Sequence, residues 1–335
     1  MRLVQIARGR GERRVALVES DRLRLLDPRQ HTSIYSLAMH AANTGGDLEL
    51  AAQESATRES VEYDAVYEGT SDWHLLPAFD HPEDSAHCIV SGTGLTHKAS
   101  AENRAAMHKR AETEMTDSMR MYQMGLEGGY PPPGIIGVQP EWFFKGDGSI
   151  LRAHGEGLTI PPYAWDGGEE PEIVGGYLIS PTGEPVRVGL TVGNEFSDHR
   201  MEKTNYLYLA PSKLRNCSIG PELTVGPIDF NDVPGTVTIF RNNAVAWSKK
   251  IWSGEKNMSH SVANLEHHHF KYEAHRHPGD VHIHFFGADA FSFGEGVPLE
   301  PGDTMEISFP KLGRPLRNSL KICGKPQQFI RVRTL

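Results

Sequence analysis

Three glutamates stand directly before an apolar run in the segment DGGEEPEIVGGYLI, residues 166–179. If the run is a strand, Glu170 and Glu172 point to the same face, because side chains alternate along a strand. Pro171 between them donates no backbone hydrogen bond, so this end must lie at a sheet edge or at the start of the strand. Burying carboxylates so close together without a partner would cost several kcal/mol each. We therefore expect positive charge beside them.

Two carboxylates on one strand face make half of a site for a hard divalent cation. A third is available in VGLTVGNEFSD, residues 188–198, where Glu195 stands just beyond another strand-like run. Ligand sets made of oxygen alone suit Mg²⁺, Mn²⁺ or Ca²⁺ rather than zinc, and magnesium commonly keeps positions for water and substrate. The pattern predicts a metal site formed by Glu170, Glu172 and Glu195. Taken alone, Glu-x-Glu also fits glutamates on a solvated surface.

A second candidate cluster is the histidine-rich segment HHHFKYEAHRHPGDVHIHFF, residues 267–286. His282 and His284 alternate on one strand face and could bind zinc or iron together with His275 or His277. No glutamate follows within a few residues to complete such a set. We expect instead that one face of this strand packs or hydrogen-bonds inside the β fold, while the other histidines are exposed.

The composition is that of an ordinary globular protein and excludes several classes of function. Of 335 residues, 38% are hydrophobic, and no apolar run reaches the roughly 18 residues that could span a bilayer. The N-terminus has no apolar stretch of signal-peptide length, so we expect a cytoplasmic protein. A formal net charge of -9 argues against nucleic acid as the main partner. The three scattered cysteines indicate neither a disulfide framework nor a CxxC metal site.

The chain divides at a polar, proline-containing segment. Residues 1–76 predict a small module with short strands and a helix over residues 33–43, for which Ser33 is a plausible cap. Residues 77–85 form the predicted linker, and residues 86–335 the catalytic domain. The predicted fold class is therefore mostly β with some α (α+β).

Within the large domain, residues 99–126 predict a polar helix rich in Ala, Glu, Arg and Met, which is either a solvated face or a movable lid. From residue 135 onward, short strand-like segments alternate with glycine and proline turns, which favours a β fold closed or folded over itself. The glycines of SGTGLTHKAS, residues 91–100, are no phosphate-binding loop, because no GK[ST] follows.

Six segments follow one another in the order typical of the fumarylacetoacetate hydrolase superfamily, which the chain resembles over residues 88–314. The resemblance implies a mixed β-sandwich roll for the C-terminal domain, beside a small N-terminal α/β module, and it implies a homodimer. The segments are CIVSGTGLTHKASAENR (88–104), PEWFFKGDGSI (140–150), EEPEIVGGYLIS (169–180), GNEFSDHRME (193–202), PSKLRNCSIGP (211–221) and LEPGDTMEISFPKLGRP (299–315).

The resemblance also assigns roles to individual residues. It places the three metal ligands, for Mg²⁺ with Mn²⁺ or Ca²⁺ as substitutes, on the same glutamates as the strand pattern does. His97 falls on the catalytic histidine, Glu102 lies where its acidic partner is expected, and Lys213 falls on the substrate lysine. The expected substrate-binding residues are Lys213, Thr93, Lys145 and Glu202.

Three departures from the family pattern favour one of its branches. Glu195 stands where Asp is usual, residues 307–310 read Ile-Ser-Phe-Pro instead of Thr-Gly-Thr-Pro, and Glu102 follows His97 at a spacing of five instead of three. These changes argue against simple hydrolysis of a carbon-carbon bond. The sequence looks closest to the branch linked with sugar-acid breakdown, which includes 2-keto-3-deoxy sugar acid dehydratases.

The resemblance therefore implies a magnesium-dependent hydro-lyase acting on a 2-keto-3-deoxy sugar acid, for example a 2-keto-3-deoxypentonate of the arabonate or xylonate type that is converted to 2-oxoglutarate semialdehyde. The partner expected is this small 2-keto acid. Hydrolysis of a 2,4-diketo acid, decarboxylation of an oxaloacetate-like acid, and sugar-acid binding without catalysis remain as alternatives, since one fold serves several reactions.

Overall fold

The computed structural model describes residues 1–9, 11–108 and 115–335 of the chain, and two β-sheets dominate this part. The larger sheet has 13 strands. They are β1 (Arg2–Arg8), β2 (Glu12–Glu19), β3 (Arg22–Leu26), β4 (Ala56–Glu62), β5 (His74–Leu75), β6 (Cys88–Gly94), β7 (Glu141–Asp147), β8 (Leu151–Arg152), β10 (Pro171–Ile179), β11 (Pro185–Asn194), β12 (Cys217–Ile219), β13 (Leu223–Thr224) and β16 (Val281–Phe285). Its main path runs β4-β3-β2-β1-β13-β11-β10-β16-β6-β7.

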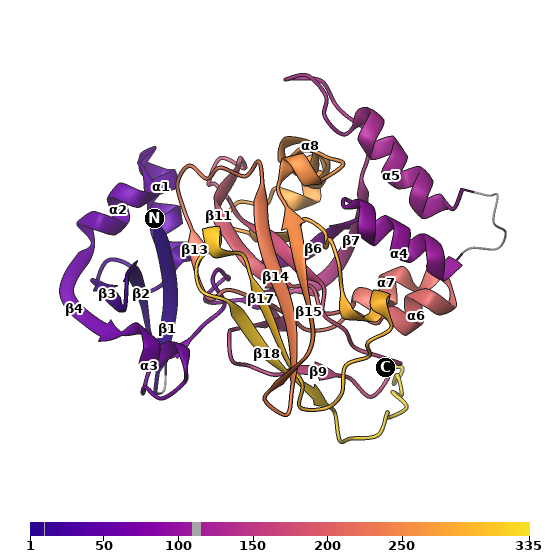
Figure 1. Cartoon of the computed structure of the whole chain (residues 1–335). Helices are drawn as coiled ribbons and strands as arrows, with labels where there is room; N and C mark the ends of the chain where they lie inside the picture. Colours follow the sequence, from indigo (N-terminus) through magenta and orange to yellow (C-terminus); the bar gives the residue numbers. More distant parts are fainter. Residues whose placement is uncertain (10, 109–114) are drawn as a thin grey trace.

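The smaller sheet has five strands and the order β15-β14-β17-β18-β9. Its members are β9 (Leu158–Ile160), β14 (Val233–Arg241), β15 (Ala244–Ser253), β17 (Thr304–Ser308) and β18 (Leu316–Ile322). The helices described are α1 (Ile34–Thr44), α2 (Leu48–Glu54), α3 (Tyr63–Tyr67), α4 (Lys98–His108), α5 (Asp117–Gly128), α6 (His199–Thr204), α7 (Leu209–Lys213) and α8 (Val262–Phe270). Figure 1 shows α1 to α3 at one side of the molecule and α4 to α7 at the other. The predicted combination of β and α structure is confirmed.

The N-terminal strands continue the large sheet, because β1 pairs antiparallel with β13. Helix α1 begins after Ser33, whose side chain accepts a hydrogen bond from the backbone N–H of Ser36. The hydroxyl of Ser36 in turn accepts a hydrogen bond from the backbone N–H of Ser33, so the two residues form a capping box. The helix predicted at residues 33–43 and its cap are thus confirmed. The division into residues 1–76, 77–85 and 86–335 stays a prediction.

Strand β10 is buried along its whole length and separates two hydrophobic cores. Ile173 and Tyr177 pack in the core shared with the smaller sheet, and Val174 and Leu178 pack in the core beneath α1. A strand covered on both faces reads as a continuous apolar run, as EIVGGYLI does. Packing on both faces therefore fixes the position of β10, and with it the position of the glutamates at its start.

The register between β10 and β11 brings the predicted metal ligands to one place. Pro171 lies opposite Asn194, and Glu172 lies opposite Gly193. One residue beyond this ladder, the backbone N–H of Glu195 donates to the carbonyl of Glu170 over 2.9 Å. Residues far apart in the sequence thus meet at one end of an antiparallel pair.

The histidine-rich strand β16 lies between β10 and β6. His282 and His284 are buried, and His269 from α8 bonds to His282, Nε2 to Nδ1, over 2.9 Å. His284 contacts the hydroxyls of Ser91 and Thr93 at 2.8 and 2.9 Å. The expectation that this face hydrogen-bonds inside the fold is confirmed. The expectation that the other histidines are exposed is wrong for His268 and His269, which are buried where α8 packs. Among the described residues, the acidic triad is the sole group arranged to hold a metal ion.

The single helix predicted over residues 99–126 is wrong in its extent. The structure has α4 and α5 there, and the residues 109–114 between them lie outside the described part. Thr116 caps α5 by accepting a hydrogen bond from the backbone N–H of Met119, and Asp117 adds an acidic first turn. These are start signals inside the segment that we read as continuous.

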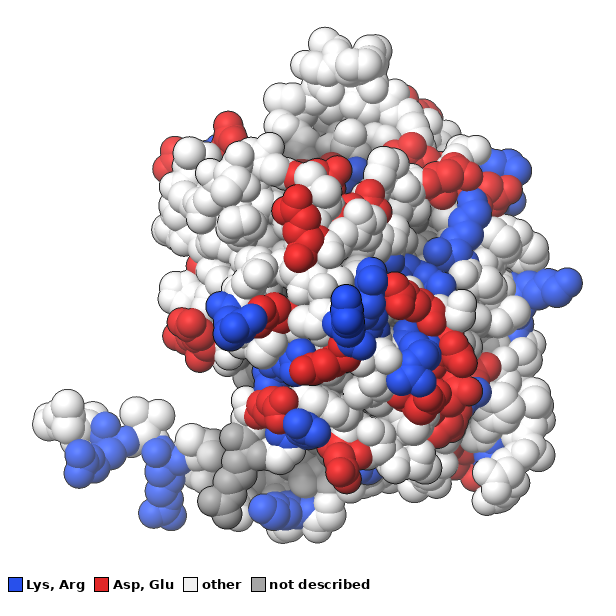
Figure 2. All heavy atoms as spheres, turned by 90° about the vertical axis from the view of Figure 1, so that its left-hand side faces the viewer, with Lys and Arg blue, Asp and Glu red and all other residues white. Residues whose placement is uncertain are grey.

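Charges on the face formed by the N-terminal module are mixed, with basic and acidic side chains interspersed (Figure 2). Arg24 pairs with Glu19 at 3.0 Å, and Arg14 pairs with Glu59 at 3.2 Å. Alternating signs of this kind give no basic patch for phosphate on this face. None of the helices in the described ranges is long and apolar enough to cross a membrane.

The buried histidines predict that stability falls as the pH is lowered from neutral. Burial lowers the pKa of His282 and His284 to about 3, and it holds the pKa of His269 well below its usual value. The unfolded chain binds protons on these rings near pH 6.5, where the folded chain does not. Each such proton costs about 1.4 kcal/mol per pH unit below that point.

We therefore expect the midpoint of urea unfolding to drop between about pH 7 and about pH 5, above the range in which paired carboxylates titrate. His282→Asn should flatten this drop, while the matched change His74→Asn, at an exposed position on β5, should leave it unaltered. A midpoint independent of pH across this range would contradict the prediction.

Candidate active site

Three carboxylates converge where β10 begins and β11 ends. Glu172 lies in β10, Glu170 precedes its first residue, and Glu195 follows the last residue of β11. One oxygen from each of Glu170, Glu172 and Glu195 lies within 4.8 Å of the others, and all three side chains are buried. Carboxylate oxygens at this separation form a ligand set for a hard divalent cation. The structure therefore brings together the three predicted metal ligands.

Two ammonium groups lie beside the triad, as the crowding of carboxylates led us to expect. Lys213 Nζ donates to Glu170 Oε1 over 2.7 Å and to Glu195 Oε2 over 2.8 Å. Lys145 Nζ lies 2.5 Å from Glu195 Oε1. Burial disfavours the charge on Lys213, but Glu170 and Glu195 outweigh it and hold the pKa of Lys213 well above its usual value.

Glu172 is the member of the triad whose negative charge has no positively charged partner among the described residues. Its Oε2 accepts a hydrogen bond from the backbone N–H of Gly287 over 2.6 Å. No lysine, arginine or histidine in the described ranges forms an ion pair with it. Burial raises the pKa of Glu172 well above its usual range, and repulsion from Glu195 and Glu170 adds to the effect. A divalent ion would relieve this repulsion, so the donor set fits the expected metal.

Glu169, the first of the three clustered glutamates, does not belong to the triad. Its carboxylate accepts hydrogen bonds from the backbone N–H and the hydroxyl of Ser292, over 2.6 and 2.9 Å. In an extended chain, side chains at odd and even positions point to opposite faces. Glu169 therefore points away from the face that carries Glu170 and Glu172.

The catalytic candidate His97 is buried, and its hydrogen bonds define which ring nitrogen is basic. Thr96 Oγ1 donates to the carbonyl of Phe286 over 2.8 Å, so this oxygen can only accept from His97 Nδ1 at 2.9 Å. The proton on Nδ1 leaves a lone pair on Nε2, for which no described group is a partner. Burial lowers the pKa of His97 to about 4, so the ring is neutral at pH 7.

Glu102 does not contact His97, contrary to the expected pairing. Residues 98–108 form helix α4, and the Glu102 side chain is 56% exposed on its surface. Its carboxylate lies 3.7 Å from Lys98, one helical turn earlier. No hydrogen bond or ion pair joins it to His97 in the part of the chain that is described.

Two of the expected substrate-binding residues use their polar groups within the protein. Thr93 bonds to His284, and Lys145 donates to the carbonyls of Phe196 and Lys213, over 2.7 and 3.1 Å, besides its contact with Glu195. These three contacts use the three donors of an ammonium. Lys145 is thus placed to hold Glu195, and its direct role in binding substrate stays a prediction.

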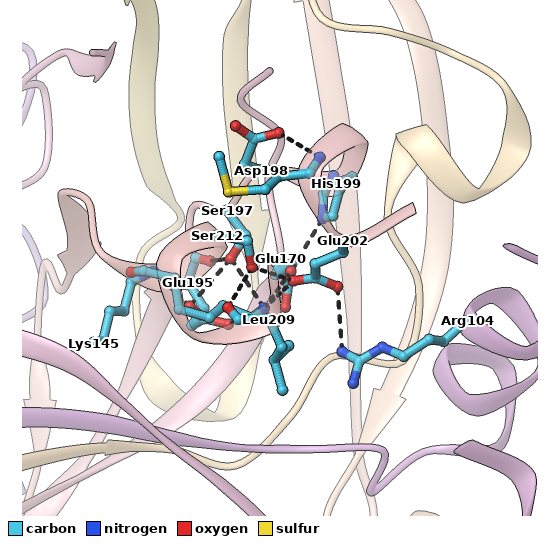
Figure 3. A network of polar contacts seen from close by, with 12 residues as sticks. Arg104, Lys145, Glu170, Glu195, Ser197, Asp198, His199, Glu202, Leu209 and Ser212 are labelled. Carbon is cyan, nitrogen blue, oxygen red and sulfur yellow. Dashed lines mark hydrogen bonds and ion pairs between the residues drawn. The ribbon is translucent and has the colours of Figure 1, made fainter. Parts of the chain in front are cut away.

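Glu202, the remaining expected substrate residue, lies in a buried polar network that begins at the triad and continues to Arg104 (Figure 3). It accepts from the hydroxyl of Ser212 over 2.9 Å and lies 3.4 Å from Lys213 Nζ. Its other oxygen lies 3.5 Å from Arg104, which comes from α4. Figure 3 shows Arg104 reaching toward Glu202 from the side opposite Lys145.

Sequence reasoning missed three residues of this network: His199, Arg104 and Glu141. His199 Nε2 lies 3.0 Å from Glu170 Oε1, and its ring stacks on Phe291. Burial disfavours the charged ring, but the hydrogen bond to Glu170 prevails, so the pKa of His199 is raised. All three residues lie in segments that carry the family resemblance, and this was the signal that could have identified them.

Comparisons with known proteins give a structural match without a sequence match. No protein-family model matches the chain, and no curated protein matches it. Among solved structures, 2-keto-3-deoxy-D-arabinonate dehydratase in its apo form is 20% identical with a TM-score of 0.70, over 97% of this chain and 100% of that one. The same kind of dehydratase complexed with magnesium and 2,5-dioxopentanoate is 18% identical, with the same TM-score and coverage. A 2-hydroxyhepta-2,4-diene-1,7-dioate isomerase from Mycobacterium marinum is 17% identical with a TM-score of 0.58 and the same coverage.

At these identities the comparisons establish the fold. The chain has the fold of these dehydratases and isomerases over almost its whole length.

Proposed function

We propose that the protein is a magnesium-dependent dehydratase of a 2-keto-3-deoxy sugar acid, with a 2-keto-3-deoxypentonate as substrate and 2-oxoglutarate semialdehyde as product. The observation that carries this proposal is the buried triad of Glu170, Glu172 and Glu195 with Lys213 bonded to two of its members. The dehydratase of the same fold that was complexed with magnesium and 2,5-dioxopentanoate supports it. We further propose that the protein acts in the cytoplasm as a homodimer.

The triad would hold the cation, and the cation supplies stabilisation of negative charge on the 2-oxo oxygen of the substrate. Lys213 is the group that binds the substrate carboxylate or the enolate oxygen, and the surrounding glutamates secure its charge. To do so, its ammonium exchanges its 3.0 Å contact with the hydroxyl of Ser197 for the substrate oxygen. His97 takes the proton from C3 with Nε2, because its Nδ1–H is committed to Thr96. The orientation of the ring is thus fixed without Glu102.

Dehydration removes one proton from C3 and the hydroxyl from C4, which together leave as water. The proton held on His97 Nε2 is available to the departing hydroxyl, so one residue can act first as base and then as acid. This leaves a double bond between C3 and C4, with the hydroxyl still on C5. Transfer of a proton from C5 to C3 then gives the C4=C5 enol, which tautomerises to the C5 aldehyde by losing its hydroxyl proton and gaining a proton at C4. The pKa of His97, lowered to about 4 by burial, keeps the base form present at neutral pH and makes its protonated form a strong acid.

The reaction class is tested by a panel of substrates. Purified protein with Mg²⁺ is incubated with 2-keto-3-deoxypentonates, an acylpyruvate and oxaloacetate, and the products are identified by mass spectrometry. We expect an aldehyde product that is one water lighter than the pentonate. Cleavage of the acylpyruvate would favour the hydrolase, loss of CO₂ from oxaloacetate the decarboxylase, and binding without turnover the non-catalytic alternative. Each of these outcomes would overturn the dehydratase.

Glu172→Gln should abolish Mg²⁺ binding and turnover while the fold is retained. Loss of one charged oxygen ligand weakens a hard-cation site far more than it alters packing. Mn²⁺ binding followed by electron paramagnetic resonance measures the site independently of activity. Glu169→Gln is the matched control, since that carboxylate is bonded to Ser292 outside the triad. Full Mn²⁺ affinity in Glu172→Gln would exclude Glu172 from the ligand set.

His97→Ala should leave Mn²⁺ binding unchanged and remove exchange of the C3 protons of the substrate into deuterated water. General-base catalysis by a positioned side chain contributes about 10²–10⁴-fold, so turnover should fall by a comparable factor. Exchange is followed by proton NMR, with Glu102→Gln beside it. We expect Glu102→Gln to keep most of the exchange, because its carboxylate does not contact His97. Undiminished exchange in His97→Ala would move the base elsewhere.

A further inference from the structure

A row of three charged side chains extends from the triad toward α4 and β7. Glu202 lies 3.4 Å from Lys213 and 3.5 Å from Arg104 Nη2. Arg104 Nη1 in turn donates to both oxygens of Glu141, over 2.7 and 2.8 Å. We call Glu202, Arg104 and Glu141 the Arg104 row. It begins beside the lysine that bonds to Glu170 and Glu195, and it ends at the first residue of β7.

The row is buried to an extent that packing does not require. Arg104, Glu141 and Glu202 are 7%, 7% and 4% exposed. Charged side chains are seldom so buried, and well-packed apolar residues of similar volume commonly serve stability as well or better. Gly94 on β6 leaves room for the end of the row, since a Cβ there would lie 1.8 Å from Glu141 Oε2. Several elements thus cooperate to keep this charge in place.

The chemistry of the row favours hydrogen-bond donors that carry no negative charge. Each ionised carboxylate offers about four acceptor positions, and Glu141 receives two contacts from Arg104 and one from the hydroxyl of Tyr206 at 3.1 Å. About one acceptor position on Glu141 therefore remains for a hydroxyl group. The cation of the row, Arg104, is already paired with Glu141 and Glu202 within the described residues.

We propose that the Arg104 row selects the tail of the substrate, accepting an uncharged tail that bears hydroxyls and rejecting a second carboxylate. A ligand whose 2-oxo acid head lies at the triad extends its far end toward α4 or away from it. If it extends toward α4, the far end meets Glu202 and Glu141, where a carboxylate would be repelled by like charges. The substrate is then a monoanionic, hydroxylated 2-keto acid. This inference rests on the proposed function in that the head must bind at the triad.

The test compares two ligands of equal chain length that differ at C5. Calorimetric binding with Mg²⁺ is measured for 5-hydroxy-2-oxopentanoate, which ends in a hydroxyl, and for 2-oxoglutarate, which ends in a carboxylate. We expect the wild-type protein to bind the hydroxylated ligand at least about tenfold more tightly. Glu141→Gln should reduce this preference about tenfold, whereas the exposed change Glu59→Gln should leave it unaltered.

Equal or tighter binding of 2-oxoglutarate by the wild-type protein would overturn the proposal, as would a preference unchanged in Glu141→Gln. Because that variant leaves Arg104 with less charge compensation, thermal unfolding is measured in parallel. If Glu141→Gln does not fold, Glu141→Asp is tested in its place. This variant keeps the negative charge, so it should keep the preference for the hydroxylated ligand. Loss of the preference in Glu141→Asp would refute the role of charge. These are binding measurements, so they stand even if 2-keto-3-deoxypentonates are not dehydrated, which would refute the proposed function alone.

Discussion

The pairing of buried carboxylates with buried ammonium groups is the constraint on which the site depends. Glu195 is held at one oxygen by Lys145 and at the other by Lys213. Removing one partner of such a buried pair typically costs about 3–5 kcal/mol, because the other charge is left uncompensated. Apolar residues would stabilise this region as well or better. The charges therefore point to chemistry at the triad, where ionised oxygens have to be kept out of water.

The scaffold satisfies this constraint through strand register. Strand β10 lies between two hydrophobic cores, so sliding it by one residue would exchange the faces on which Val174 and Ile173 pack. The register that this packing selects sets Glu172 opposite Gly193 and leaves Glu170 and Glu195 just beyond the ladder. Apolar packing in the middle of the strand thus determines the distances between carboxylates at its end. Packing of the cores and placement of the metal ligands are thus served by different residues of the same segment.

The sequence predicted those parts of the site that lie on regular strands. Alternation placed Glu170 and Glu172 on one face ahead of the strand, and the order of the family-like segments supported them as ligands. A capping residue located the start of α1. The family resemblance named Lys213, Lys145 and Glu202, which come from helices and a distant strand, but other such partners were missed or misplaced. Arg104 meets Glu141 at a separation of 37 residues, which no local pattern encodes, and Glu102 lies on the exposed surface of the same helix. The break between α4 and α5 was missed because Thr116 and Asp117 were read as part of a polar helix.

The network also accounts for a departure from the family pattern that the sequence alone left unexplained. Glu195 stands where aspartate is usual, and its longer side chain has to place one oxygen within 4.8 Å of Glu170 and Glu172. Its two oxygens bond to lysines from different elements, Lys145 on β7 and Lys213 at the end of α7. The additional methylene lets the carboxylate reach between these two ammonium groups while it remains in the triad. Aspartate at this position would retract the carboxylate by one bond, so the glutamate and the buried Lys145 are best understood as a matched pair.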